Sequence, residues 1–225
     1  MKSPQPTFSI GSVCKEGFRR NRIPALILQT FAAVLLALYF LVPELRSGFE
    51  AIGKLKADTG IWFALVSTAF FGGFIPWIVM VQRGRIKKGE RTKHLLFFLG
   101  FWALQGFMVD QLYTLQDEWF GSEATLRVLL LKVLVDQIPF NLFWATPNSL
   151  IFYGWKNADF SWRKLWQSHS KQSFFQKYAT IQISAWVIWI PAVLMIYSLP
   201  PNLQVPLFNL VLCFFSLVLA FISRD

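Results

Sequence analysis

The sequence consists largely of apolar runs, each about as long as a helix needs to cross a membrane. Because an α-helix rises about 1.5 Å per residue, about 20 apolar residues span a hydrocarbon core of about 30 Å. The predicted spans are residues 23–42, 61–81, 95–115, 126–152, 179–199 and 205–222. We therefore predict an all-α, multi-pass transmembrane helical bundle of about six spans: a basic N-terminal tail (residues 1–22) followed by a single transmembrane domain (residues 23–225).

Composition supports the membrane assignment and limits the choice of partners. Charged residues make up 15% of the chain and apolar residues 55%, whereas soluble domains contain roughly 25% charged residues. The net charge of +10 makes nucleic acid a candidate partner, because Lys and Arg neutralise phosphates. The basic residues lie in short connections between apolar runs, however, where anionic lipid headgroups account for them. We expect membrane lipid, and no nucleic acid, as a partner, and leave open whether the chain forms a homo-oligomer.

Lys and Arg are distributed unequally between alternate connections. Seventeen lie within residues 1–22, 82–94, 156–177 and 223–225, whereas four lie on the opposite side, with Lys132 set aside as intramembrane. Positive residues favour the cytoplasmic side of a membrane. This asymmetry predicts an even number of spans, with both termini on the cytoplasmic or matrix-like side. A bacterial plasma membrane and an organelle membrane fit equally well.

Several helix-breaking residues lie inside the predicted spans. The second span contains the Gly72-Gly73 pair and Pro76, and we expect close helix packing at the glycines and a kink near the proline. The fourth span, residues 126–152, is long for one crossing and contains Pro139 and Pro147. We expect it to be tilted or broken.

The connection between the fourth and fifth spans has an amphipathic pattern. Its more apolar positions follow helical spacing, at Trp162, Leu165, Trp166, His169 and Ser173, and its basic residues fall elsewhere around the helix. We predict an interfacial amphipathic helix anchored by tryptophans. The alternative is a basic loop without regular structure.

The fourth span contains ionisable residues at membrane depth, which cost several kcal/mol unless they face the bundle interior. Counting about 1.5 Å per residue, Lys132 lies roughly 9 Å and Asp136 roughly 15 Å deep. Asp110 of the third span lies at a depth similar to Lys132. We predict that Asp110, Lys132 and Asp136 form an interhelical cluster, in which a Lys132–Asp136 ion pair is feasible. Its expected polar neighbours are Gln105, Gln137 and Asn141.

The sequence supports two interpretations of this cluster about equally. Buried polar groups often only join helices in membrane bundles. Alternatively, they line a hydrophilic path and select among charged solutes.

The two histidines do not form a catalytic or metal-binding pattern. His94 and His169 lie at span edges without Cys, Asp or Glu at metal-ligand spacing, so no catalytic residue, metal or cofactor is expected and the chain is not predicted to be an enzyme. Trp186, Trp189 and Tyr197 could form an aromatic ligand site, but packing around Pro191 is the commoner explanation.

Several short motifs from Gly106 onward occur in the order seen in a known family. They are Lys132-x-x-x-Asp136-Gln137, Trp162-x-Lys164-Leu165, and Trp189 followed by Pro191, Tyr197 and Pro201. In these elements the chain resembles the Mpv-seventeen and peroxisomal-membrane-protein-twenty-two family of small multi-span proteins.

The resemblance implies a membrane pore or permeability factor for small hydrophilic solutes rather than an enzyme. It marks Lys132, Asp136, Gln137, Trp162, Lys164, Leu165, Trp189, Pro191 and Tyr197 as positions of interest. The first alternative is a non-transporting structural protein that binds a partner or lipid. A membrane-embedded enzyme acting on lipid is a less favoured second alternative.

Overall fold

The computed structural model describes residues 10–167 and 171–222, and within these residues every regular element is a helix. Six helical segments of the described chain are long and apolar enough to cross a membrane. They comprise Asn21–Leu41, Ile61–Gln82, Lys88–Phe120, Leu126–Asn157, Phe174–Tyr197 and Pro201–Val218. The predicted all-α bundle with six membrane-length helices is therefore confirmed.

The helical segments are subdivided by changes of helix type. In chain order the elements are α1 (Ile10–Leu41), α2 (Pro43–Thr59), α3 (Ile61–Thr68), η1 (Ala69–Phe74), α4 (Ile75–Gln82), η2 (Lys88–Glu90), α5 (Arg91–Phe120), α6 (Leu126–Val135), η3 (Asp136–Ala145), α7 (Thr146–Asn157), α8 (Trp162–Gln167), α9 (Lys171–Tyr197) and α10 (Pro201–Ile222). Elements η1 and η3 are π-helices, and η2 is a single 3₁₀ turn.

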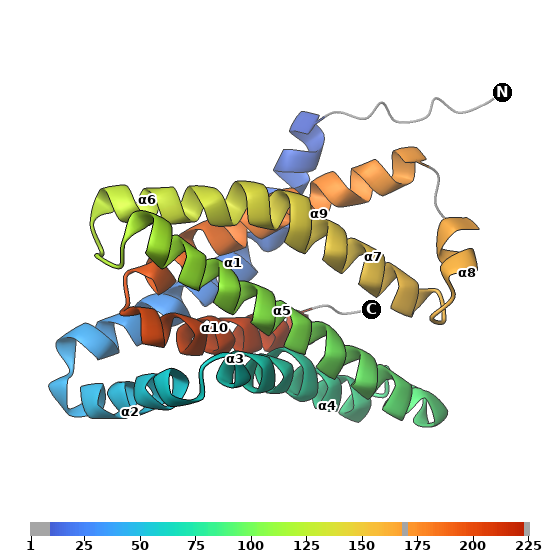
Figure 1. Cartoon of the computed structure of the whole chain (residues 1–225). Coiled ribbons are helices and arrows are strands. Elements are labelled where there is room, and N and C mark those ends of the chain that lie inside the picture. The colour runs from blue at the N-terminus through green and yellow to red at the C-terminus, as the bar shows by residue number, and fades with distance from the viewer. Residues whose placement is uncertain (1–9, 168–170, 223–225) are drawn as a thin grey trace.

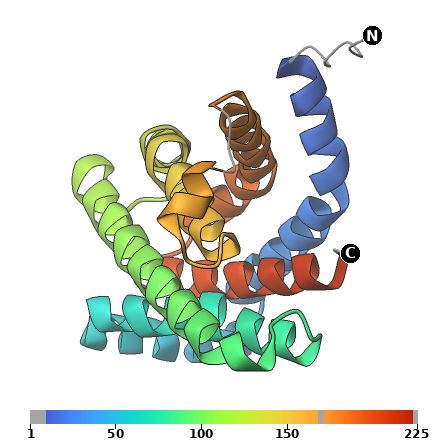
Figure 2. The same ribbon diagram turned by 90° about the vertical axis from the view of Figure 1, so that its right-hand side faces the viewer.

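The chain crosses the bundle repeatedly and reverses at two ends (Figure 1). The connections 83–90 and 158–161 lie at one end together with α8, which we call the basic end. The connections 121–125 and 198–200 lie at the opposite end with α2. Viewed from the basic end, α5 and α1 form the two sides, with α7 and α9 between them (Figure 2). Helix α10 packs against α1, α2, α3, α4, α5 and α9, and therefore forms much of the interior.

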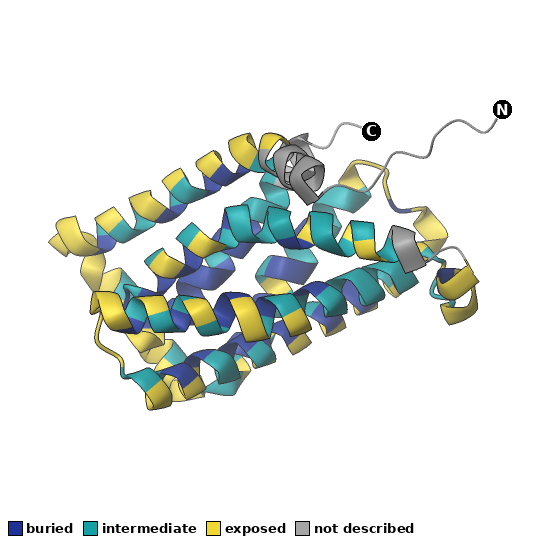
Figure 3. Cartoon of the chain, turned by 90° about the horizontal axis from the view of Figure 1, so that it is seen from above, coloured by how far each residue is buried: buried dark blue, intermediate teal, exposed yellow. Residues whose placement is uncertain are grey.

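Buried and exposed residues divide each helix into an inner and an outer face. Along α9 the residues Ile188, Ala192 and Ile196, spaced four apart, are buried in the main apolar core. Outer positions instead expose large apolar side chains, such as Trp62 at 69% and Phe143 at 71%. Figure 3 shows exposed positions on the outer surfaces of the helices and buried ones facing inward. An apolar outer surface of this kind suits contact with lipid.

Two adjacent glycines allow η1 to approach α5 closely. A Cβ on Gly73 would lie 2.8 Å from the carbonyl oxygen of Phe98, and one on Gly72 would lie 2.8 Å from the Trp102 ring. The predicted close packing at Gly72-Gly73 is confirmed. These glycines lie in π-helix η1, immediately before Pro76, where a change of helix geometry was expected.

The connection between the first two membrane-length segments is itself a helix, α2. It begins at Pro43, which is suited to a first helical turn because it lacks an N–H group that would otherwise need a partner. Gly53 of α2 packs so closely on α10 that a Cβ would lie 2.6 Å from the Asn202 side chain. The span predictions left this connection without assigned structure.

The segment predicted as one amphipathic helix is divided in the structure. Helix α8 ends at Gln167, and α9 begins at Lys171. Leu165 is buried while Trp162 and Trp166 are exposed, so the tryptophans do not share a buried face with Leu165. His169 lies outside the described residues.

Candidate functional site: a buried polar network

The predicted polar residues of the fourth span lie on the π-helix η3 and its flanks. Helix α6 begins at Leu126 after Thr125, whose hydroxyl accepts a hydrogen bond from the Val128 N–H at 3.4 Å. A π-helix forms i to i+5 hydrogen bonds, and the Thr146 N–H bonds to the Asn141 carbonyl in this way. Pro139 lies inside η3 and lacks a donor N–H. The expected break in this span therefore takes the form of a wider helix.

Asp136 is buried and held by two hydrogen bonds. The Tyr197 hydroxyl of α9 donates to one carboxylate oxygen at 2.6 Å, and the Gln137 side-chain amide donates to the other at 2.6 Å. Tyr113 of α5 packs edge-on against Tyr197, with 5.0 Å between ring centroids. Three helical segments therefore meet at this carboxylate.

The network continues from Gln137 toward the basic end. Asn141 donates to Gln137 Oε1 at 3.4 Å, and its own Oδ1 accepts from Thr146 at 3.0 Å and from Gln182 of α9 at 3.2 Å. The Trp186 indole N–H donates to the Gln137 carbonyl at 3.1 Å. Gln182 is buried, as are Gln137, Asn141 and Thr146. This chain of side-chain bonds links η3, α7 and α9.

Lys132 is paired differently from the prediction. It is 1% exposed and forms an ion pair with Asp117 of α5. Its Nζ also lies 5.8 Å from the centroid of the Tyr197 ring, and its backbone carbonyl accepts from Gln116 at 3.3 Å. The ion pair with Asp136 that was feasible from the spacing does not form, because the ammonium group points to α5 while the carboxylate points to Tyr197.

Asp110 also has another partner. Its carboxylate pairs with Lys56 of α2 at 2.8 Å. The three predicted residues therefore do not form one charged cluster. Lys132 and Asp136 both contact Tyr197, whereas Asp110 belongs to a separate ion pair that joins α2 to α5.

A small cavity of about 130 Å³, called the inner cavity below, adjoins Asp136. Its polar lining includes Gln105, Asp136, Gln137, Asn141 and Ser149, so four of the six predicted site residues share one space. Gln105 is 6% exposed, and its Nε2 has no hydrogen-bond partner among the described residues. Buried amides are normally paired with protein or water, so this cavity is suited to a polar guest.

Two larger cavities lie between this inner cavity and the basic end. The middle cavity, of about 580 Å³, shares Trp102, Asn141, Ala145, Trp189 and Leu212 with the inner one. The outer cavity, of about 640 Å³, shares Tyr153 and Ile181 with the middle one. Ser149 lines all three. The three cavities adjoin and narrow toward Asp136.

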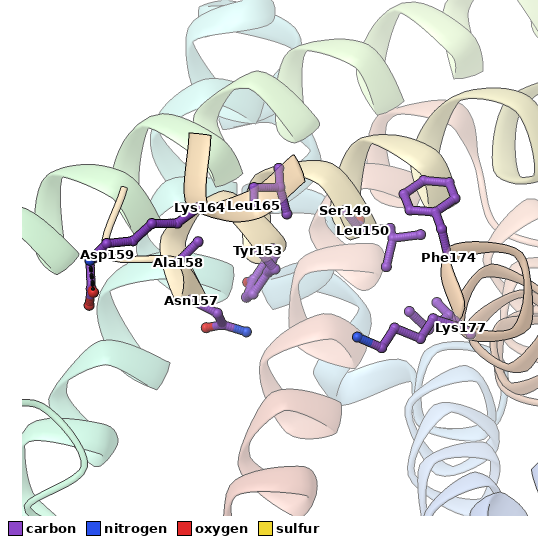
Figure 4. A pocket seen from close by; sticks show the side chains of 12 residues that line it. Ser149, Leu150, Tyr153, Asn157, Ala158, Asp159, Lys164, Leu165, Phe174 and Lys177 are labelled. Carbon is purple, nitrogen blue, oxygen red and sulfur yellow. Dashed lines mark hydrogen bonds and ion pairs between the residues drawn. The ribbon is translucent and has the colours of Figure 1, made fainter. Parts of the chain in front are cut away.

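Figure 4 shows the outer cavity between α7, α8 and the beginning of α9. Lys177 and Asn157 point toward its centre, while Lys164 extends toward Asp159. Lys164 Nζ lies 2.7 Å from the Asp159 carboxylate. This hydrogen bond and charge lower the pKa of Asp159. The outer cavity therefore combines basic side chains with apolar walls.

Three further positions marked by the sequence motifs line these cavities. Trp189 lines the middle and inner cavities, while Lys164 and Leu165 line the outer one. Trp189 packs against Phe208 and Phe215 of α10, with ring centroids 5.7 and 6.1 Å apart. Trp186, Trp189 and Tyr197 do not enclose one aromatic box, since they contact η3, α10 and Asp136 respectively.

Sequence reasoning did not identify several residues of the network. Asp117 was placed beyond the end of the third span, although α5 continues to Phe120. Thr146, Ser149 and Gln182 are small or neutral polar residues, which no depth argument distinguishes from surface positions. Lys56 could have been found only by recognising α2 as a helix that packs on the bundle.

Comparisons with protein-family models, curated proteins and solved structures find no match for this chain.

Proposed function

We propose that this chain is a multi-pass membrane protein that permits passive passage of small hydrophilic solutes through its interior. One observation supports this most strongly: three adjoining cavities lead from the basic end to a buried carboxylate. Apolar packing alone would not require such a path, and each buried polar group in a bundle has a desolvation cost. Resemblance to the Mpv-seventeen and peroxisomal-membrane-protein-twenty-two family points the same way.

In the proposed pathway, the arrangement described above is a closed state. Asp136, Tyr113 and Tyr197 lie at the inner end of the cavities, and the Lys132–Asp117 ion pair lies beyond them. Passage requires movement of these groups, as is common for gated proteins. No catalytic chemistry is part of the proposal.

The proposal includes an orientation of the chain in the membrane and its contacts with lipid. From the excess of Lys and Arg we expect the basic end on the cytoplasmic or matrix-like side. There we propose that α8 lies at the membrane interface, with the exposed Trp162 and Trp166 directed to the headgroup region. Anionic lipid headgroups are the expected partners of the basic connections.

Reconstituted liposomes provide the test of passage. Stopped-flow light scattering measures re-swelling as a small solute enters after an osmotic shock. We expect faster re-swelling than in protein-free liposomes, and a return toward that baseline in Ser149→Phe, because Ser149 lines all three cavities. The matched control is Ser47→Phe on exposed α2, which should leave re-swelling unchanged.

Two results would contradict the proposal. If folded, reconstituted protein gives no re-swelling above protein-free liposomes for any solute, the chain is a structural or partner-binding protein. If Ser149→Phe and Ser47→Phe behave alike while passage persists, solutes do not use these cavities.

A further inference from the structure

The described polar residues that line the middle cavity are uncharged. They are Asn21, Asn141, Thr146, Ser149, Tyr153, Thr180, Ser184 and Ser216, together with the indole of Trp102. Hydroxyl and amide groups both donate and accept hydrogen bonds. A guest with the same two capacities can exchange its water for these groups, whereas a bare ion brings a charge that no charged group of this cavity offsets.

The inner cavity supplies both kinds of hydrogen-bonding group at close quarters. Gln105 Nε2 is a buried donor without a partner in the part of the chain that the structure describes, while the Asp136 and Asn141 oxygens are acceptors. At roughly 30 Å³ per water, a volume of 130 Å³ corresponds to about four water molecules. A guest of this size is urea or a three-carbon polyol, and a hexitol is too large without wider opening.

The two ends of the path carry opposite charge. Two lysines, Lys164 and Lys177, and one acid, Asp159, line the outer cavity. Lys164 pairs with Asp159, and the basic connections that surround the cavity keep this end net positive. Asp136 is the one ionisable acid among the described residues that line the inner cavity. Cations are therefore disfavoured at the entrance and anions at the inner end, since charges in a low-dielectric interior interact strongly.

From this arrangement we propose that the path selects small, net-neutral solutes that both donate and accept hydrogen bonds, with urea and glycerol as representatives. Gln105 is the donor that contacts the solute, and Asp136 excludes anions. This inference rests on the proposed passage of solutes and adds the class of solute.

The test compares solutes and ions in the same reconstituted protein. Re-swelling is measured with urea, glycerol and sorbitol, and ion passage with potassium chloride in planar bilayers. We expect urea and glycerol to enter faster than in protein-free liposomes, sorbitol to enter no faster, and conductance to stay at the protein-free level.

Two variants test the roles proposed for Gln105 and Asp136. Replacing Gln105 by leucine removes one hydrogen bond to the solute, so we expect urea entry to fall by about threefold to tenfold. The matched control, Gln111→Leu, lies on the same helix outside the described cavity linings and should retain urea entry. Asp136→Asn should raise chloride conductance by on the order of tenfold, while Asp58→Asn on exposed α2 should not.

The results distinguish failure of the proposed passage from failure of the proposed solute class. Absence of entry for every solute and ion overturns the proposed function itself. Entry of potassium or chloride as readily as urea, or of sorbitol as readily as glycerol, leaves a pore but overturns the solute class. Unchanged urea entry in Gln105→Leu overturns the role of Gln105.

Discussion

At the scale of single residues, the buried charges of this bundle are stabilised by partners on other helices. Lys132 has a side chain that is 2% exposed, and its counter-ion Asp117 is 21% exposed. An unpaired buried charge is far less stable than a paired one, because the attraction to its partner offsets lost hydration. The ion pair should therefore be essential to the association of α5 with α6.

Asp117→Asn tests this dependence. Removing the carboxylate leaves Lys132 charged and buried, and we expect a loss of about 3–5 kcal/mol in the free energy of unfolding. The measurement is denaturation of the purified protein in mild detergent, followed by circular dichroism. Asp159→Asn is the control, because Asp159 and Lys164 are exposed at 73% and 61% and surface pairs contribute little. Equal destabilisation by both substitutions would contradict this interpretation.

The choice of partners is the part of the site that sequence could not predict. Depth along ideal helices correctly indicated that Lys132 and Asp136 are buried. It could not give the rotation of each helix about its axis, which decides whether Lys132 meets Asp136 or Asp117. Extension of α5 to Phe120 brought Asp117 into the helix, whereas the predicted span ended at residue 115.

At the scale of helices, glycine sets how closely α3 and α5 approach. A Cβ on Gly106 would lie 2.4 Å from the Ala64 carbonyl oxygen and 2.7 Å from Thr68. Thr68 in turn donates a hydrogen bond to Asn209 of α10 at 2.7 Å. A wider separation of α3 from α5 would disturb this second polar contact as well.

Gly106→Ala should therefore destabilise the bundle by about 1–3 kcal/mol, the usual cost of overpacking an interior. Gly100→Ala on the same helix is the matched control, because a Cβ there meets no atom within 4 Å. An added methyl at Gly100 should be neutral or stabilise by about 0.5–1 kcal/mol, since alanine favours the helix. Thermal melting of both variants in detergent gives the comparison, and a melting temperature unchanged in Gly106→Ala would contradict the close packing.

Helix η3 illustrates a second limit of sequence reasoning. The run of proline and polar residues predicted an irregular fourth span, and the structure has a π-helix there. A regular 3.6-residue period would not bring Thr146 beneath Asn141, five residues earlier, whereas the wider turn does. Which irregular geometry forms depends on contacts with α9, including the bond from Gln182 to Asn141.

At the scale of the whole molecule, hydrophobic run length was sufficient to predict six membrane-length helices, because the bilayer constrains length directly. The structure of α2 was not predictable in the same way. Its charged sequence has no membrane-length apolar run, and its position depends on the Lys56–Asp110 pair and on Gly53. Cavities likewise depend on the relative placement of five membrane-length segments, which no local pattern encodes.

If solutes pass through the bundle, water reaches its interior from the basic end, and cysteine accessibility measures this. In a background with Cys14 and Cys213 replaced by serine, a single cysteine is placed at Ser149, inside the cavities, or at Phe143, 71% exposed on the outer face of η3. A small water-soluble methanethiosulfonate reagent, applied to the protein in liposomes, reacts with thiolates, which require water to form. We expect modification of Ser149→Cys and protection of Phe143→Cys by lipid. The reverse pattern, with Ser149→Cys protected and Phe143→Cys modified, would rule out a hydrated path through these cavities.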